Sequence, residues 1–313
     1  ADADGHLSSK EFQVMFLVAG GESAGGYIPG IWAHAGCIPS YGRETFDGYS
    51  IGECAYQGYS TFGERQGNYD ATIGVIAHEL GHAIFCYPDL YDITEKSSGI
   101  GLFGLMSAGS WGSKQGEYGG ATPVHLMAWS KYKSDGSLCY KDILSLDGTE
   151  NTANYNGVVF ELPDNISSNT SSVALYHTTH TNFNTKIINI SGKTKEYFML
   201  ENIGHDGYQA GLDYLLWGND NTSGIAIWHI DDNQSNNGAD VNHKLVDLEE
   251  AAEAGMDNSS HSGKQTNLFF SGNKTEFSDS TDPNSKTYSG TSSGITINNI
   301  SASGDSMTFD ITF

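Results

Sequence analysis

Two histidines with a glutamate between them mark the stretch AHELGHAIFCYPDLYD, residues 77–92. His78, Glu79 and His82 fit the pattern H-E-x-x-H, and residues four apart lie on one face of a helix. Both imidazoles can then reach one zinc ion at roughly 2.0–2.1 Å. Glu79 would lie beside the water that the zinc activates, which suits a general base in peptide hydrolysis. The spacing predicts a zinc-dependent peptidase.

A helix must carry these residues, and the surrounding sequence predicts one of roughly four turns. Apolar residues at helical spacing predict its buried stripe: Ile73, Ala77, Leu80 and Ile84. Residues 68–70 offer an N-cap, and Pro88 must end the helix. After a glycine-rich loop, Thr122 and Pro123 predict the start of a second helix over residues 122–133.

Strands are predicted on both sides of these helices. The run FQVMFLVAGG, residues 12–21, predicts a strand before them, and the edge strand that pairs with a substrate backbone is expected around residues 15–26. Short alternating strands follow later in the chain, at residues 157–162, 172–177, 195–203, 224–231, 267–272, 294–300 and 306–313. They predict an antiparallel, sandwich-like β domain.

The length of 313 residues is enough for two domains. Because short alternating strands dominate after about residue 145, we predict an α+β protein with a catalytic domain at residues 1–145 and a β-rich domain at residues 146–313. The formal charge of -23 argues against nucleic-acid binding and against docking on anionic lipid. The longest apolar run, residues 14–19, is far too short for a transmembrane helix.

The first residues, ADADGHLSSKE, place Asp2, Asp4 and Glu11 at the offsets of a calcium-binding EF-hand loop whose first position is missing. They predict a calcium site, with a solvated acidic turn as the alternative. The same residues contain no signal peptide. We therefore expect a processed or truncated chain.

Four cysteines in a chain expected to be secreted predict two disulfides. Proximity favours the pairs Cys37–Cys54 and Cys86–Cys139. Four thiols are the alternative.

The motifs together carry a family resemblance. HELGH with PDLYD, GLFGLMSAGSW, PVHLMAWSKYK, EYFMLENI and GIAIWHIDDN occur in order. The chain resembles the immune inhibitor A family of secreted bacterial metallopeptidases, in the metzincin clan. The resemblance implies a metzincin-like zinc peptidase domain with a mixed sheet and an active-site helix. It also implies secretion as a precursor with a propeptide, structural calcium, and protein or peptide substrates.

Carried over by position, His78 and His82 are zinc ligands and Glu79 is the general base. The family pattern H-E-x-x-H-x-x-G-x-x-(H/D) has a glycine where Phe85 stands, and this chain has one extra residue before PDLYD. The resemblance assigns Asp89 as the third ligand, with Asp92 as the alternative, and we expect the helix to end differently to absorb the insertion.

Other residues receive weaker roles. Met106 matches the Met-turn beneath the zinc ligands, and Tyr118 is the nearest tyrosine that could stabilise the oxyanion. His34 and His125 are expected to be structural, and His229 is expected to face away from Ile227 in its strand. Acidic residues in the resembling blocks could bind calcium, tie the two domains together, or be solvated or salt-bridged: Glu201, Asp231 and Glu249.

Three other functions are compatible with parts of this sequence. One is a zinc hydrolase acting on a different substrate. A second is a catalytically inactive zincin-fold adhesin or a glycan- or protein-binding module, against which the intact Glu79 argues. A third is a gluzincin, whose third ligand is a glutamate on a later helix, but residues 122–133 contain no glutamate.

Overall fold

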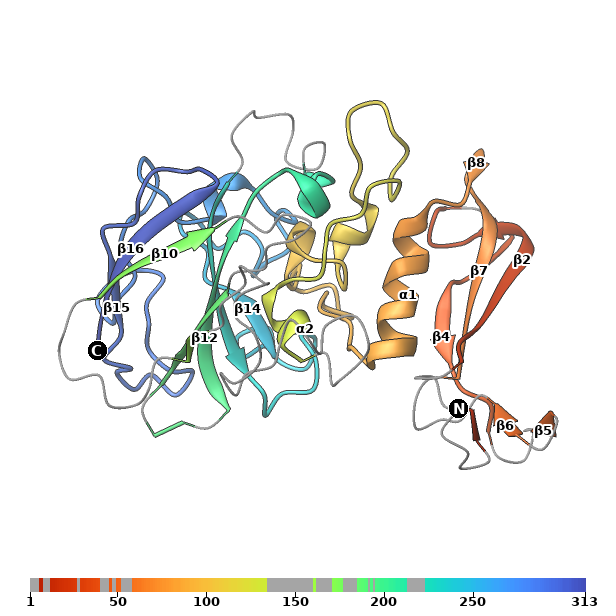
Figure 1. Cartoon of the computed structure of the whole chain (residues 1–313), viewed down its shortest axis with the longest axis horizontal. Helices are drawn as coiled ribbons and strands as arrows, with labels where there is room; N and C mark the ends of the chain where they lie inside the picture. The colour runs from red at the N-terminus through yellow and green to blue at the C-terminus, as the bar shows by residue number, and fades with distance from the viewer. Residues whose placement is uncertain are drawn as a thin grey trace, which may run out of the picture.

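The computed structural model describes residues 6–7, 12–26, 29–39, 45–46, 49–51, 58–133, 160–161, 171–176, 185–190, 192–193, 195–212 and 223–313. A mixed sheet and a long helix form the N-terminal part, and two further sheets form the C-terminal part (Figure 1). This is the predicted α+β class. Within the described part, every helix is too short or too polar to span a lipid bilayer.

The N-terminal sheet is mixed, as predicted. β2 (Val14–Glu22) lies in its interior and runs parallel to both β7 (Tyr59–Gln66) and β3 (Gly30–Ile31). β4 (His34–Gly36) pairs antiparallel with β7 and ends the sheet, while β8 (Tyr69–Asp70) forms a hairpin with the end of β7. The strand expected from residues 12–21 is confirmed. β3 and β4 end the described sheet, and β3 pairs with β2 only at Gly21 and Glu22, so the expectation that a substrate pairs around residues 15–26 stays a prediction. A small second sheet contains β1 (His6–Leu7), β6 (Tyr49–Ile51) and β5 (Thr45–Phe46).

α1 (Ile73–Phe85) carries the H-E-x-x-H motif, as predicted. Its N-cap is Thr72 rather than a residue of 68–70, because Asp70 pairs with Arg65 in the β7–β8 hairpin. The buried face also differs from the predicted stripe: Ile73 is 58% exposed. The buried positions are instead largely small residues and the motif itself, namely Gly74, Val75, His78, Glu79, Gly81 and Ala83.

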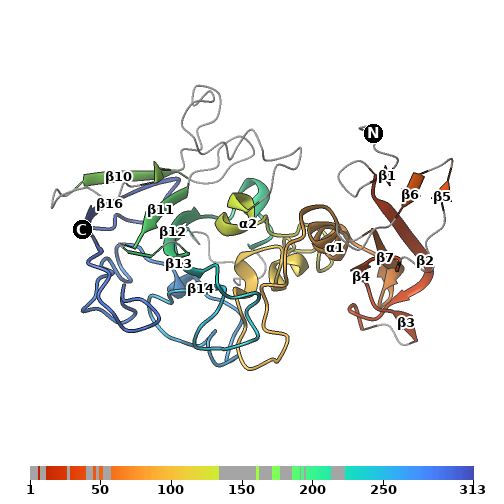
Figure 2. The same cartoon turned by 90° about the horizontal axis from the view of Figure 1, so that it is seen from below.

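The face of α1 with the small residues is buried because the backbone of the following loop comes very close to the helix there. A Cβ atom at Gly74 would lie 1.8 Å from the carbonyl oxygen of Ser110, in the 3-10 turn η4 (Ala108–Trp111). The small residues therefore let the following loop pack directly against the helix. α1 lies between the N-terminal sheet and the rest of the protein (Figure 2).

α2 covers only Ala128–Tyr132, so the predicted helix over residues 122–133 is too long. The backbone before it bonds to the preceding loop in three pairs, Thr122 N–H to Gly112 O, Val124 N–H to Gly109 O, and Leu105 N–H to His125 O. These tertiary bonds hold residues 122–125 beside that loop. Met127 is the N-cap of α2, and its sulfur accepts a hydrogen bond from the N–H of Trp129.

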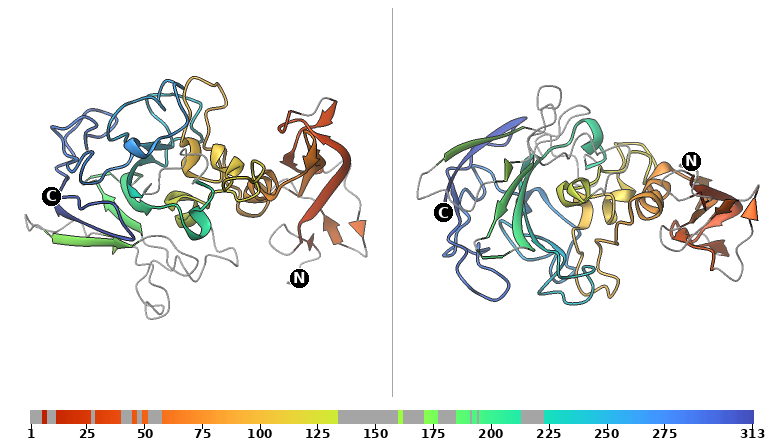
Figure 3. Two further views of the ribbon diagram at one scale, coloured as in Figure 1. Left: turned by 90° about the horizontal axis from the view of Figure 1, so that it is seen from above. Right: turned by 60° about the horizontal axis from the view of Figure 1, so that its bottom comes forward.

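Two sheets form the C-terminal part, at the end of the molecule farthest from β2 (Figure 3). The five-stranded sheet has the order β14-β13-β12-β11-β9 and is antiparallel except for the parallel pair of β9 and β11, and the three-stranded sheet β10-β16-β15 is antiparallel. The predicted strand at residues 267–272 is wrong: Phe269 makes only an isolated bridge to Ile225. The strands are β9 (Phe160–Glu161), β10 (Ser171–Tyr176), β11 (Thr185–Asn189), β12 (Glu196–Ile203), β13 (Gly224–Asp231), β14 (Val246–Leu248), β15 (Thr296–Asn298) and β16 (Ser306–Thr312). Further 3-10 turns are η3 (Gly101–Phe103), η5 (Gly207–Gln209) and η6 (Gln265–Asn267).

Two large hydrophobic clusters hold this arrangement together. One lies between the two C-terminal sheets and includes Phe198, Ile227 and Phe309. The other contains Leu90 and Met106 from the N-terminal part together with residues of β12, β13 and β14, Trp228 among them. This second cluster therefore draws residues from both sides of the predicted boundary at residue 145.

A buried ion pair adds to this connection. Lys131 of α2 lies 3.0 Å from Glu201 of β12, and both side chains are fully buried. Glu201 also accepts a hydrogen bond from the N–H of Ala128 at the start of α2. Glu201 thus ties α2 to the sheet, which is one of the roles expected for it.

The cysteines are described only in part. Cys86 carries a thiol, so the predicted pair with Cys139 is wrong. Cys86 ends α1, where it serves as the helix C-cap. Cys37 is disulfide-bonded, but its predicted partner Cys54 lies outside the described residues and that pairing stays a prediction.

Candidate metal centre

His78 and His82 lie one turn apart on α1, with their rings nearly perpendicular. The ring centroids are 4.8 Å apart at an interplanar angle of 87°, and the two Nε2 atoms are 3.1 Å apart. Oδ1 of Asp89 lies 3.1 Å from Nε2 of His78 and 3.0 Å from Nε2 of His82. Three potential ligand atoms therefore meet at one point.

Backbone carbonyls hold the other ring nitrogens. Nδ1 of His78 lies 2.9 Å from the carbonyl oxygen of Leu105, and Nδ1 of His82 lies 2.5 Å from that of Tyr87. Since a carbonyl can only accept, each Nδ1 must donate, and each neutral imidazole then has its lone pair on Nε2. Two lone pairs and a carboxylate oxygen cannot satisfy one another, but a cation among them would satisfy all three. A backbone carbonyl on the second nitrogen is the usual partner of a metal-binding histidine.

The donor set fits zinc. Two imidazole nitrogens and one carboxylate oxygen leave a fourth position open, as catalytic zinc sites require. Bond lengths of about 2 Å put neighbouring ligands of a tetrahedral zinc roughly 3.3 Å apart, which is close to the observed separations. In the described part of the chain, this is the one group of three or more His, Cys, Asp or Glu side chains whose candidate ligand atoms lie within 4.8 Å of one another.

The carboxylate of Asp89 is held in its charged form. Burial alone would raise its pKa, but the close contacts with His78 and His82 outweigh burial and hold the pKa well below its ordinary value. The same contact raises the pKa of His82, against the opposing effect of burial.

The end of α1 absorbs the extra residue in this motif. The helix runs through Phe85, and Cys86 then adopts the left-handed conformation with a φ of 56°. Its N–H bonds to the carbonyl oxygens of Gly81 and His82, a helix ending that most often uses glycine. The chain then turns back, so Asp89 reaches the two imidazoles although Phe85 occupies the expected glycine position.

Asp92, the alternative third ligand, lies elsewhere. It is 3% exposed, and its oxygens accept hydrogen bonds from the N–H and hydroxyl groups of Thr94 and Ser97. Those bonds hold its pKa below the ordinary value despite burial. Asp92 closes the loop that follows the metal centre and lies outside the convergent group.

Met106, the predicted Met-turn residue, packs against α1 at Gly81. It is 1% exposed, and a Cβ atom at Gly81 would come within 2.5 Å of its sulfur. The carbonyl oxygens of Leu105 and Met106 accept bonds from His78 Nδ1 and from the N–H of Leu90. This turn therefore positions both the helix and the segment that carries Asp89, and it explains why glycine stands at position 81.

Glu79 lies beside the two histidines and is 7% exposed. Burial raises its pKa above the ordinary value, although His78 and His82 oppose this effect. The backbone of Ala35 in β4 hydrogen-bonds to the carboxylate. A carboxylate whose pKa is raised accepts a proton more readily than an ordinary one, which suits a general base.

Tyr91 is a residue that sequence reasoning missed at this site. Its ring stacks on His78, with centroids 6.2 Å apart and an angle of 24°. Its hydroxyl lies beside Asp89, and burial together with this carboxylate raises the pKa of the hydroxyl. Tyr118, the predicted oxyanion residue, stacks instead on Tyr69 at 4.0 Å and does not line the cleft. The position of Tyr91 two residues after Asp89 was the available signal, because alternate residues of an extended segment face the same side.

A cleft opens over the metal centre. It has a volume of about 510 Å³ and is lined by residues 32–35, by His78, Glu79 and His82 of α1, by residues 86–89 with Tyr91, and by Ser235. A second hollow of about 390 Å³ shares Trp32, Ala33, His78, Glu79 and Tyr91 with it and adds apolar side chains that include Val75, Ile93 and Trp111. His34, expected to be structural, thus lies in the cleft wall.

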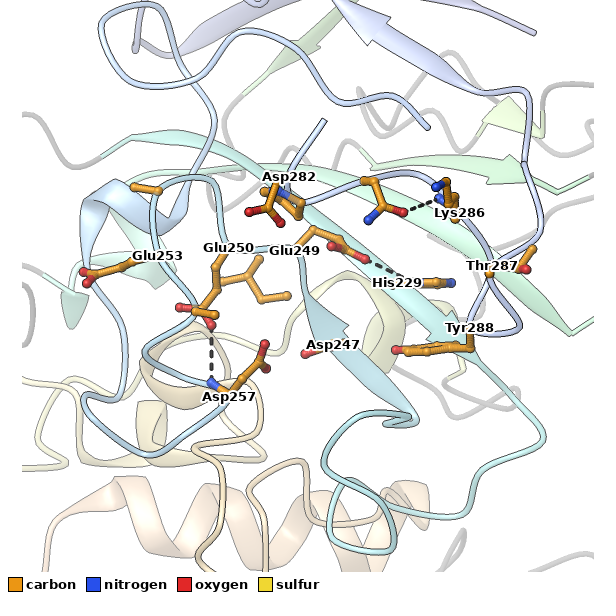
Figure 4. A pocket seen from close by; sticks show the side chains of 16 residues that line it. His229, Asp247, Glu249, Glu250, Glu253, Asp257, Asp282, Lys286, Thr287 and Tyr288 are labelled. Atoms are coloured by element: carbon orange, nitrogen blue, oxygen red, sulfur yellow. Dashed lines mark hydrogen bonds and ion pairs between the residues drawn. The ribbon is translucent and has the colours of Figure 1, made fainter. Parts of the chain in front are cut away.

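A separate pocket lies in the C-terminal part, with a volume of about 460 Å³. Acidic side chains surround it, and Figure 4 shows His229 and Tyr288 on one side of them. Their charges are already paired in part: Lys244 lies 2.5 Å from Asp247 and also contacts Asp257, and His229 contacts Glu249. His229 packs on Phe198 of the core, so the prediction that it faces away from Ile227 is wrong, as residues two apart in a strand share a face.

The predicted calcium ligands and Asp231 lie away from the cleft residues named above or outside the described part of the chain. Asp2, Asp4 and Glu11 lie outside the described residues, so the calcium site stays a prediction. Asp231 accepts hydrogen bonds from Asn233 and lies 2.7 Å from His243.

Comparison with protein families decides the identity of this region. Residues 3–138 match the immune inhibitor A peptidase M6, catalytic domain. This part of the chain is an immune inhibitor A-like metallopeptidase. The match contains the whole convergent group, Glu79 and Met106, and it ends before the C-terminal sheets, so the resemblance in residues 139–313 stays a prediction. A comparison with curated proteins gave no match.

Proposed function

We propose that this metallopeptidase is a secreted bacterial zinc endopeptidase in which His78, His82 and Asp89 bind the metal and Glu79 is the general base. The observation that carries the proposal is the convergence of two Nε2 lone pairs and one carboxylate oxygen within about 3 Å of one another. Zinc bound there would supply Lewis acidity and lower the pKa of a water molecule.

Glu79 performs the proton transfers in this proposal. Its raised pKa lets the carboxylate accept a proton from the attacking water and then donate it to the leaving amine. The Ala35 backbone and the two imidazoles lie close to the carboxylate and favour its charged form. Burial keeps bulk water from competing for the carboxylate.

The cleft is suited to an extended peptide. β4 ends the described part of its sheet, and residues 32–35 line the cleft, so a substrate backbone can add to β4 as a further strand. The adjoining hollow has an apolar lining that includes Val75 and Trp111. We propose that it receives an apolar substrate side chain next to the cleaved bond.

Secretion, the propeptide and calcium are parts of the same proposal that rest on the family and on the sequence. The net charge of -23 is compatible with an extracellular protein. Asp2, Asp4 and Glu11 remain the proposed calcium ligands. A chelator selective for calcium should lower the melting temperature, and unchanged melting would contradict this part.

Cleavage of casein by the wild-type chain and by Glu79→Gln, each assayed for bound zinc, tests the catalytic proposal. We expect the variant to retain zinc and to lose about 10²- to 10⁴-fold in rate, the usual contribution of a general base. Glu276→Gln is the matched control, because Glu276 is exposed in the C-terminal part and lines neither the cleft nor the adjoining hollow, and it should cleave at the wild-type rate.

Two outcomes would contradict the proposal. Equal cleavage by wild type and Glu79→Gln would remove Glu79 from the reaction. A wild-type chain that holds zinc but cleaves neither casein nor a mixed peptide library would favour the inactive binding protein instead.

A further inference from the structure

Tyr91 has a fixed direction because the residue before it is anchored. Leu90 is fully buried, its N–H donates to Met106 O at 2.8 Å, and its carbonyl oxygen accepts from Ile100 N–H at 2.9 Å and from Asn237 Nδ2 at 2.8 Å. With Leu90 pointing into the core, the side chains on either side of it point the opposite way. Asp89 and Tyr91 therefore face the cleft together.

The aromatic ring and the hydroxyl of Tyr91 contact different parts of the metal centre. The ring stacks on His78, and the hydroxyl lies beside the carboxylate of Asp89, where burial and that carboxylate raise the pKa of the hydroxyl. A carboxylate ligand can rotate about its side-chain bonds, whereas each imidazole here is already fixed by a backbone carbonyl. Asp89 is thus the ligand that most needs an orienting partner, and Tyr91 supplies one.

From these contacts we infer that Tyr91 is a positioning residue of the metal centre: its hydroxyl orients the Asp89 carboxylate toward the two Nε2 atoms, and its ring steadies His78. The inference rests on the proposed zinc function. Loss of an outer hydrogen bond to a metal ligand typically costs about 10- to 100-fold in metal affinity. The effect on zinc should therefore be measurable without an activity assay.

Tyr91→Phe isolates the hydroxyl, since phenylalanine retains the ring that stacks on His78. The matched control is Tyr118→Phe, an exposed tyrosine that stacks on Tyr69 and does not line the cleft. Zinc affinity is measured on the full chain by competition with a chromophoric chelator. The absorption spectrum of the cobalt-substituted protein then reports the ligand geometry.

We expect Tyr91→Phe to bind zinc about 10- to 100-fold more weakly and to shift the cobalt spectrum, with an unchanged melting temperature in the absence of metal. Tyr118→Phe should match the wild type in each measurement. A zinc affinity of Tyr91→Phe within about twofold of the wild type, with an unchanged cobalt spectrum, would overturn the inference alone. A wild-type chain that binds neither zinc nor cobalt would overturn the proposed function as well.

Discussion

At the metal centre two histidines face one carboxylate, whereas at His229 one histidine faces two. His229 Nδ1 lies 3.1 Å from Glu249 and its Nε2 lies 3.2 Å from Glu196. Both of its ring nitrogens can donate, so the imidazole is charged and each carboxylate receives a proton-bearing partner. Burial opposes this charge, but the two carboxylates outweigh burial and raise the pKa of His229 to about 9.

The two clusters differ in how many lone pairs are left over. Around His229 every ring nitrogen has an acceptor, and Glu196 also accepts from the N–H of Tyr288 and pairs with Lys193. Around His78 and His82 the backbone carbonyls take the only ring N–H groups, and three lone pairs remain. The same residue types therefore form a closed structural ion pair in one region and a metal site in the other. Counting donors against acceptors separates them, while residue type alone does not.

The largest expected effect comes from removing a ligand. His82→Gln should lower zinc affinity by more than about 100-fold and should abolish cleavage of casein. Losing only a hydrogen-bond partner of a ligand already lowers metal affinity about 10- to 100-fold, and losing the ligand itself should lower it further. Chelator competition and metal analysis measure the loss. His229→Gln is the matched histidine variant and should retain wild-type zinc content. Loss of zinc from His229→Gln alone would reverse the comparison.

A smaller effect should appear in the pH dependence of stability. The pKa of His229 is raised from about 6.5 to about 9 on folding, so its stabilising contribution is fully present below pH 6.5 and disappears as the pH rises through 9. The shift corresponds to roughly 3 kcal/mol of unfolding free energy. Urea unfolding of the wild type at pH 6.5 and 9.5 should show a decrease of this order.

His229→Gln is the control. Its unfolding free energy should lack the part of the decrease that comes from the charge of His229. Tyr288, which stacks on His229, does not interfere, since burial raises its pKa well above the ordinary value. Parallel pH profiles for the wild type and the variant would show that His229 is not charged in the folded protein.

The smallest effect concerns the end of α1. Cys86 has a φ of 56°, a conformation that costs most residues roughly 1–2 kcal/mol and glycine almost nothing. Cys86→Gly should raise the unfolding free energy by about 0.5–1 kcal/mol, because the greater freedom of glycine in the unfolded chain offsets part of the gain. Cys86→Ala removes the thiol but retains the Cβ atom, so it should not stabilise. Equal urea midpoints for the two variants would contradict this explanation of the inserted residue.

Sequence reasoning succeeded where the relevant contacts are local. His78, Glu79 and His82 are joined by one helical turn, so their spacing alone predicts a shared face. The strand over residues 12–21 follows likewise from its own apolar run, and β12, β13 and β16 from their alternation. Asp89 came from the family resemblance, and the structure brings it to both imidazoles.

Prediction failed where distant backbone groups compete with local preference. Thr122 and Pro123 favour a helix start, but bonds from residues 122–125 to the loop around Gly109 and Gly112 delay α2 until Ala128. In α1 the predicted apolar stripe is not the buried face. The face with Gly74 and Gly81 is buried instead, because only glycine leaves room for the Ser110 carbonyl oxygen and the Met106 sulfur. Neither approach can be read from the helix sequence.

The sequence by itself determined the chemistry available to this protein: a helix with two histidines and a glutamate, and an acidic, strand-rich chain around it. Tertiary structure decided which groups meet. The left-handed turn at Cys86 returns Asp89 to the imidazoles, and the buried Leu90 directs Tyr91 toward the same cleft. Backbone carbonyls from two other turns then orient both histidines. Helical spacing is a property of neighbours in sequence, whereas a metal site depends on lone pairs that only the folded chain can bring together.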